Sequence, residues 1–360
     1  MSACDDCLRR TDLIAAMSGH LQVEFKRRSA PGNVLALPDE ILLEIADAPA
    51  VRARYAAFDP HAARARATEV ALTAICRCDS AYPTRLNDLE DPPAVIHVLG
   101  DPSTLQHEDA LAVVGARRAS SYGLEVARAL GRALSAAGVT VVSGLALGVD
   151  SAAHAGALKA KGPTIGVLAG SAHVAYPARG WLLHQAVAQR GAVISELPPG
   201  AACQRWCFIA RNRIIAALGA ATIVVQATRN SGSLTTADFA AELGRAVGAV
   251  PGLVTSSLSA GTHGLIQQGA PLIRNPADAL ELLANITGRQ YKAQPPAPQL
   301  TKKLRQLLEA IEAGKGTLGE LATTPADARL ALVALDELER LGLIRRGFGG
   351  RWERTAGVRS

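Results

Sequence analysis

Short aliphatic segments alternate with helix-length stretches between about residues 82 and 285. The aliphatic segments are AVIHVLG (94–100), ALAVVG (110–115), VTVVSG (139–144), PTIGVLAG (163–170), AVISE (192–196), ATIVVQA (221–227) and AVGAVPG (246–252). Apolar runs of this length, bounded by glycine or proline, are typical of strands in a parallel sheet that helices cover on both faces. The pattern predicts a doubly wound α/β domain.

The flanking segments have different patterns. From about residue 8 to 75, apolar residues recur at spacings of three and four, as in the segment 38–58, and this predicts short helices without candidate chemistry. Residues 287–300 carry three prolines and no periodicity, which predicts a linker. Beyond it, three helices are predicted at 301–313, 316–322 and 325–341, and then two short strands around a turn from Gly347 to Gly350. This order is that of a winged helix.

We therefore expect a helical N-terminal domain at 1–78, an α/β domain at 79–286, a linker at 287–300 and a winged-helix-like domain at 301–360. A length of 360 residues is consistent with this division, since domains average roughly 150 residues. The composition, 49% hydrophobic and 19% charged, is that of a globular protein. Because only 4% of residues are aromatic, an exposed aromatic side chain would stand out.

Charge and hydropathy narrow the class of protein. The sequence has no basic start followed by an apolar core, and no apolar run of membrane-spanning length. We therefore expect a soluble cytoplasmic protein without a membrane partner. The formal net charge of +6 is compatible with a polyanionic partner, although it is modest for a dedicated nucleic-acid coat.

Four of the six cysteines, Cys4, Cys7, Cys76 and Cys78, form a CxxC pair and a CxC pair. Four thiolates can hold zinc in a tetrahedron, but this requires contact across about 70 residues. The alternative is that they are reduced, small buried residues. The sequence by itself favours that alternative, so we predict no metal.

Small and hydroxyl residues follow the predicted strands. In an open parallel sheet, ligands bind beyond the carboxyl ends of the strands, where backbone amides and helix N-termini attract anions. The residues at these ends are Gly115, Ala116, Arg117, Ser143, Gly144, Ser195, Glu196 and Gln226, the last followed by TRNSGSLTT (228–236). The pattern predicts a phosphate-binding edge.

Arg117 and Arg118 stand where a dinucleotide-binding loop would continue with glycine. A nucleic-acid strand presents a row of phosphates, and long positive side chains suit that row better than a single pyrophosphate. An exposed arginine without a ligand is the alternative.

A second group of arginines strengthens the nucleic-acid hypothesis. Arg211, Asn212 and Arg213 fall just before or within the first turn of a predicted apolar helix, where cations oppose the helix dipole unless an anion lies between them. Phe208 precedes them and is a candidate platform for stacking one base, the alternative being ordinary core.

Asp150 and His154, four residues apart on one helix, suggest an acid–base or metal pair. We favour a capping role for Asp150, because one histidine beside one carboxylate lacks the further ligands of a catalytic metal. The sequence predicts no catalytic residues.

The motifs together resemble the bacterial DNA-processing protein A family (DprA/Smf). The resemblance runs over about 190 residues and rests on VVGARRASSYG, VVSGLALGVDSAAHAGAL, TIGVLAGSAHVAYP, VISELPPG, CFIARNRIIAALG and NSGSLTTADFAAELGRAVGAVPG, in the family's order and spacing. It implies an extended Rossmann-like, mainly parallel α/β domain, a helical (SAM-like) N-terminal domain and a C-terminal winged helix.

The resemblance also implies a function. Such a protein binds and protects incoming single-stranded DNA, loads the RecA recombinase during natural transformation, and forms a homodimer through the Rossmann-like domain. It would be neither an enzyme nor a user of cofactors. Carried over by motif, the DNA-binding residues are Gly115, Arg117, Ser143, Gly144, Phe208, Arg211, Asn212, Arg213, Ser231, Gly232, Ser233 and Thr235.

Two departures from the family pattern weaken individual contacts. Gly180, with Arg179 beside it, stands where asparagine is usual after the YP motif, and Gln226 replaces a common acidic residue. The rival hypothesis is a nucleotide-processing hydrolase of the lysine-decarboxylase-like type, which uses a related loop before a glutamate. Here Ala237 and Asp238 occupy the place of that glutamate.

Overall fold

A mainly parallel eight-stranded sheet organises the larger of two compact units, which are residues 1–294 and 295–360. The structure is a computed structural model that describes residues 3–27, 32–291, 300–322, 324–341, 343–347 and 350–354. The strands are β1 (Thr73–Cys76), β2 (Val95–Gly100), β3 (Ala110–Val114), β4 (Thr140–Ser143), β5 (Thr164–Val167), β6 (Ala192–Ser195), β7 (Ala221–Val224) and β8 (Ala246–Ala249).

The strand order is β1-β2-β6-β5-β4-β3-β7-β8. Strand β2 is antiparallel to both of its neighbours, and the pairs from β6 to β8 are all parallel. Each of the seven predicted aliphatic segments contains one strand, so the prediction of a doubly wound, Rossmann-like α/β fold is confirmed.

Helices cover both faces of the sheet, because successive side chains of a strand point to opposite sides. Leu111 and Val113 of β3 pack into one core with α7 (Ser121–Ala136), α8 (Val149–Lys159) and α13 (Pro276–Thr287). Ala112 and Val114 pack into the other core with α10 (Arg205–Leu218) and α11 (Gly232–Glu242). Two further helices of this unit are α9 (Trp181–Arg190), on the α8 side, and α12 (Ala260–Gln267). Short 3-10 turns are η1 (Thr84–Asp88), η2 (Pro102–Gln106), η3 (Ala178–Gly180) and η4 (Ser257–Ser259).

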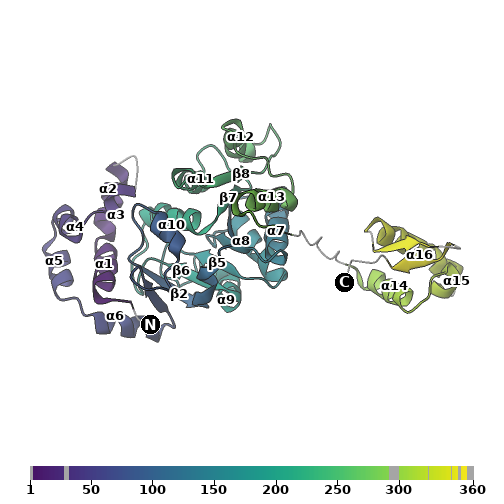
Figure 1. Ribbon diagram of the computed structural model, residues 1–360, viewed down its shortest axis with the longest axis horizontal. Coiled ribbons are helices and arrows are strands. Elements are labelled where there is room, and N and C mark those ends of the chain that lie inside the picture. Colours follow the sequence, from purple (N-terminus) through teal and green to yellow (C-terminus); the bar gives the residue numbers. More distant parts are fainter. Residues whose placement is uncertain are drawn as a thin grey trace. The chain divides into compact units, whose positions relative to one another are not determined.

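The N-terminal helices belong to the same compact unit as the sheet. They are α1 (Asp5–Ala16), α2 (Ser18–Arg27), α3 (Gly32–Leu35), α4 (Asp39–Ala46), α5 (Pro49–Ala56) and α6 (Pro60–Glu69). They lie beside α10 (Figure 1), and Leu13, Met17 and Leu21 share a core with Trp206. The indole N–H of Trp206 donates to the carbonyl oxygen of Ser18 at 3.0 Å.

The predicted boundary after residue 78 therefore does not separate two compact units. Residues 73–76, which the sequence placed in a helical domain, form β1 at the edge of the main sheet. The short run TAIC has too few residues for its alternation to stand out, whereas pairing with β2 decides its conformation.

The smaller unit contains the predicted order of three helices and two strands. These are α14 (Lys302–Glu312), α15 (Leu318–Leu321), α16 (Pro325–Arg340), β9 (Ile344–Arg346) and β10 (Trp352–Arg354). Leu304 and Leu308 of α14 pack against Leu335, Leu338 and Trp352. The winged-helix assignment stays a prediction. Positions 348–349 of the predicted turn and 292–299 of the predicted linker lie outside the described residues.

None of the helices in the described ranges has the length and apolar character needed to cross a bilayer.

Candidate nucleic-acid interface

A cleft of about 380 Å³ opens beyond the carboxyl ends of β3 and β7. Strand β4, which follows β3 in the chain, pairs with one edge of β3. Strand β7, which follows β6 in the chain, pairs with the other edge of β3. Crevices of open α/β sheets bind ligands at such switch points. The structure brings eight of the twelve predicted residues to this cleft, namely Gly115, Arg117, Phe208, Arg211, Asn212, Ser231, Gly232 and Ser233.

Gly144 lines an adjoining pocket of about 120 Å³, together with Arg117, Tyr176, Phe208 and Arg211. A Cβ atom on Gly144 would lie 2.3 Å from a guanidinium nitrogen of Arg211, so the glycine makes room for that side chain. Its amide donates to the Asp150 carboxylate at 3.1 Å. Gly144 thus shapes the floor of the pocket, and its amide donates to Asp150 and not to a ligand.

Gly115 makes room in the same way. A Cβ atom there would lie 2.8 Å from Val149 Cγ2 and 2.9 Å from the carbonyl oxygen of Gln226. Ser143 lines neither pocket: it is fully buried, and its hydroxyl donates to the carbonyl oxygen of Val113 at 2.6 Å. The sequence predicted that these residues bind an anion. In the structure, Gly115 and Gly144 make room for neighbouring side chains and backbone, and the Ser143 hydroxyl bonds to the backbone of β3.

Arg117, Phe208 and Tyr176 form a contiguous surface at the junction of the two pockets. The Arg117 guanidinium lies 5.3 Å from the centroid of the Phe208 ring, within cation–π range. The centroid of the Tyr176 ring lies 5.3 Å from that of Phe208, and the two rings are inclined by 53°. Arg117 is exposed and has no ion pair within the described part of the chain, so its charge is available to a ligand.

Arg211 is buried beneath this surface. It donates from the same nitrogen to the carbonyl oxygens of Gly144 and Val167. Burial lowers the pKa of Arg211 to about 10, an effect that the nearby Asp150 carboxylate opposes. Burial raises the pKa of Asp150 to about 6, and Arg211 acts against this shift. At neutral pH both groups are ionised, and the Asp150 carboxylate offsets part of the positive charge that Arg211 places at the base of the cleft.

Arg213 does not belong to the cleft, contrary to the sequence-based prediction. Its side chain is 3% exposed and lies between two carboxylates, 2.9 Å from Asp91 and 2.8 Å from Glu196. These partners hold the pKa of Arg213 above its usual value despite burial. The guanidinium therefore fastens α10 to the segment that precedes β2.

Neither Arg211 nor Arg213 lies before or within the first turn of α10, contrary to the sequence-based prediction. Helix α10 begins at Arg205, so Arg211 and Arg213 lie in its second and third turns rather than its first. Two residues correspond to about 200° around a helix, and the two arginines consequently point to different sides. Asn212 lies between them, and its side-chain amide donates to the carbonyl oxygen of Gly232 at 3.0 Å.

The loop after β7 supplies hydroxyl groups to the cleft. Ser231 caps α11, and its Oγ lies 2.8 Å from that of Ser233. Thr236 lines the cleft, whereas Thr235, which the sequence predicted, does not. Ser231, Ser233 and Thr236 thus surround the N-terminus of α11, which carries the partial positive charge of the helix dipole.

Asp150 and His154 do not form an acid–base pair. Asp150 accepts from Gly144, while His154 is fully buried with Nδ1 2.8 Å from Thr164 Oγ1. Burial lowers the pKa of His154 to about 4, so the imidazole is neutral. Asp150 is the one carboxyl group among the described residues that line the cleft.

Several residues of this region were not identified as site residues from the sequence. Tyr176, 53% exposed, belongs to the YP motif and could have been found as an exposed aromatic in an aromatic-poor chain. Thr228 and Leu258 also line the cleft. Leu258 comes from η4, more than 30 residues after β7, and no local pattern indicates its position.

The family described as DNA recombination-mediator protein A matches residues 73–284 of the chain. The putative DNA processing protein DprA of Mycobacterium tuberculosis is 40% identical over 270 residues, which cover 72% of this chain and 68% of the relative. The DNA processing protein DprA of Bacillus subtilis is 42% identical over 202 residues, which cover 56% of this chain and 68% of the relative.

Two solved structures share the fold. The X-ray structure of DNA processing protein A from Streptococcus pneumoniae has a TM-score of 0.63 and 31% identity, covering 78% of this chain and 98% of the other. The second structure is that of DNA processing protein A from Helicobacter pylori and concerns its single-stranded DNA binding mode. It has a TM-score of 0.55 and 30% identity, and the match covers 59% of this chain and 96% of the other.

Proposed function

The chain belongs to the DNA recombination-mediator protein A family, and we propose that its cleft binds single-stranded DNA. The observation that carries this proposal is the surface of Arg117, Phe208 and Tyr176 beside the cleft. It combines a positive group for a phosphate with aromatic faces for unpaired bases, which is the usual construction of single-strand sites. The structure of the Helicobacter pylori relative, which shares the fold, concerns the way in which that protein binds single-stranded DNA.

The site should prefer single strands to duplex for a geometric reason. Phe208 is half-buried and lines both pockets, so only a base that has left its stack can reach the ring. The bases of a duplex are stacked and paired, and its phosphates alone would contact Arg117. Strand preference therefore comes from the aromatic contact, and affinity comes from the charge.

The finer role follows the family. We propose that the protein protects incoming single-stranded DNA and loads the RecA recombinase onto it during natural transformation, as a homodimer joined through the Rossmann-like unit. The family's description as a recombination mediator supports the recombinase step. In a dimer, two clefts on one strand would raise avidity without new contacts. Light scattering tests the dimer, and a strand-exchange assay with purified recombinase tests the loading.

Binding rather than catalysis is the proposed activity. A nucleotide-processing hydrolase would need an acid or base near the bound sugar. Asp150 is the one carboxyl group among the described cleft residues. It is buried, accepts a hydrogen bond from the Gly144 amide and lies close to Arg211. Incubation with nucleoside monophosphates should release no free base. Release at a rate that depends on Asp150 would instead support the hydrolase.

The direct test measures fluorescence anisotropy with one labelled oligonucleotide, presented as a single strand and as a duplex, at moderate salt. We expect the single strand to bind about five- to 150-fold more tightly, since one stacked base contributes about 1–3 kcal/mol. Equal affinity for the two forms would contradict the proposal.

A further inference from the structure

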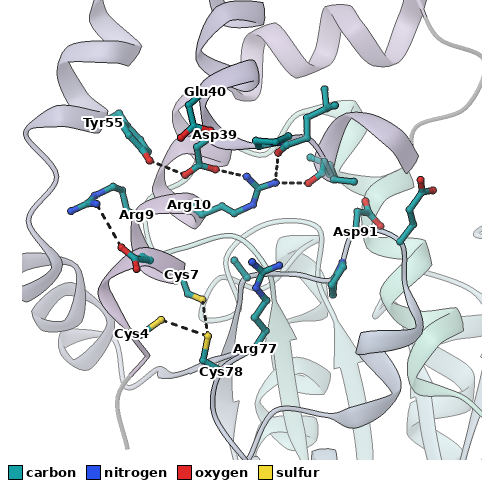
Figure 2. Close-up of a pocket in the computed structure, with 18 residues that line it drawn as sticks. Cys4, Cys7, Arg9, Arg10, Asp39, Glu40, Tyr55, Arg77, Cys78 and Asp91 are labelled. Atoms are coloured by element: carbon teal, nitrogen blue, oxygen red, sulfur yellow. Dashed lines mark hydrogen bonds and ion pairs between the residues drawn. The ribbon is translucent and has the colours of Figure 1, made fainter.

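Four cysteines from two distant segments converge at the start of α1. Cys4 precedes α1 and Cys7 lies in its first turn, while Cys76 ends β1 and Cys78 follows two residues later. The four sulfur atoms all lie within 4.8 Å of one another. Figure 2 shows Cys4 and Cys7 directed toward Cys78 at the border of a hollow of about 540 Å³. The contact across about 70 residues, which the sequence could not show, is present.

The spacing of the sulfurs is that of ligands around one small ion. The Sγ atom of Cys78 lies 3.8 Å from that of Cys7 and 4.0 Å from that of Cys4. Zinc–sulfur bonds of about 2.3 Å in a tetrahedron place neighbouring sulfurs about 3.8 Å apart. A disulfide would require about 2.05 Å, and all four thiols are free.

The residues around the four sulfur atoms are those expected for a structural metal site. Cys7 and Cys76 are buried in an apolar cluster with Leu8 and Val95, while Cys78 is exposed and leaves an entry path. The backbone N–H of Cys4 donates to Cys76 Sγ at 3.4 Å. The N-terminus of α1 also favours negative charge, which stabilises thiolates.

We propose that Cys4, Cys7, Cys76 and Cys78 bind one Zn²⁺ as a structural site. Four thiolates fill the coordination sphere of the ion and leave no position for a substrate, so the site would not be catalytic. On binding, the thiols lose their protons and no electrons are transferred. The sequence alone favoured small buried cysteines, and their convergence reverses that preference.

The zinc would fasten α1 to the edge strand of the sheet. Helix α1 contributes Leu13 to the core that also contains Trp206 of α10, and α10 carries Phe208. A metal that binds only the folded state adds its binding free energy to the stability of the protein. This proposal is independent of DNA binding.

The test begins with the metal content of the full-length protein, purified without chelators and measured by plasma mass spectrometry. We expect about one zinc per chain in the wild type and less than about 0.2 in Cys78→Ser. Cys78 is the most exposed of the four, so its substitution disturbs packing least. Cys203→Ser is the matched control, because Cys203 is an exposed cysteine outside the cluster, and it should keep the full zinc content.

A second measurement does not depend on how the variants fold. Reduced wild-type protein, freed of metal, should bind one equivalent of Co²⁺ and develop the intense visible bands of a tetrahedral thiolate complex, and Zn²⁺ should displace it. Substoichiometric zinc together with a lack of these bands would overturn the proposal. Iron with inorganic sulfide in place of zinc, or a disulfide among the four cysteines in freshly purified protein, would overturn it as well.

Discussion

Replacing Arg117 with alanine should remove one phosphate contact from the cleft while leaving the fold intact. Arg117 is exposed, lies after β3 rather than in a core, and contacts the face of Phe208. Its removal breaks no ion pair among the described residues and leaves Arg118 in the same cleft. The expected effect is therefore confined to DNA affinity.

The magnitude follows from counterion release. Each phosphate contact on a single strand contributes about 0.7 to the slope of log K against log salt, so a fourfold rise in salt weakens one contact about 2.6-fold. A hydrogen bond to a charged group contributes about 1.5–3 kcal/mol. We expect Arg117→Ala to bind a single strand about tenfold more weakly than the wild type at about 50 mM salt, and about fourfold more weakly at about 200 mM.

Anisotropy titrations at several salt concentrations measure this slope. Arg190→Ala is the matched control: Arg190 is an exposed arginine at the end of α9, next to the amino end of β6 and thus at the opposite edge of the sheet. It should keep the wild-type slope, because screening limits its effect to about 10 Å. The reasoning would be refuted by an Arg117→Ala protein that binds more weakly with an unchanged slope.

Three other substitutions test separate parts of the structure. Arg213→Ala leaves the carboxylates of Asp91 and Glu196 buried without their partner, so the free energy of unfolding in urea should fall by about 3–5 kcal/mol. The salt dependence of single-strand binding by the folded variant should be unchanged. A weaker salt dependence would show that Arg213 contacts the DNA. Phe208→Ala should weaken single-strand binding by about 1–3 kcal/mol and duplex binding less than about twofold, and equal losses would argue against stacking. His154 has a pKa of about 4 when folded against 6.5 when exposed, so protonation between pH 6.5 and 4 favours the unfolded chain and costs up to about 3 kcal/mol. His154→Gln should lose that part of the pH dependence of stability, and identical pH profiles would contradict the neutral, buried histidine.

The position of the cleft could be predicted from the sequence. Strands such as 110–114 and 221–224 are marked by local apolar runs, and the glycine and hydroxyl residues after them are local as well. In a parallel sheet all carboxyl ends meet at one edge, so local assignments suffice to bring Arg117 and Ser231 together.

The direction of individual side chains was harder to predict. An error of at least about one and a half turns in the start of α10 placed Arg211 and Arg213 just before or within the first turn, although their separation around the helix puts them on different sides. With the start at Arg205, the same sequence would have separated them. Helix starts without a Ser, Thr, Asp or Asn cap are poorly marked, and here the preceding residue is Gln204.

The sequence by itself determined the alternation of strands and helices, the edge of the sheet that carries the cleft, and the family, because each depends on neighbouring residues or on motifs in order. Only the tertiary structure decided that Arg213 forms a buried ion pair, that Tyr176 contacts Phe208, and that four cysteines from the two ends of the segment 4–78 converge. These contacts depend on how helices pack on the sheet, and the free energy of that packing is distributed over many distant residues rather than encoded at any one of them.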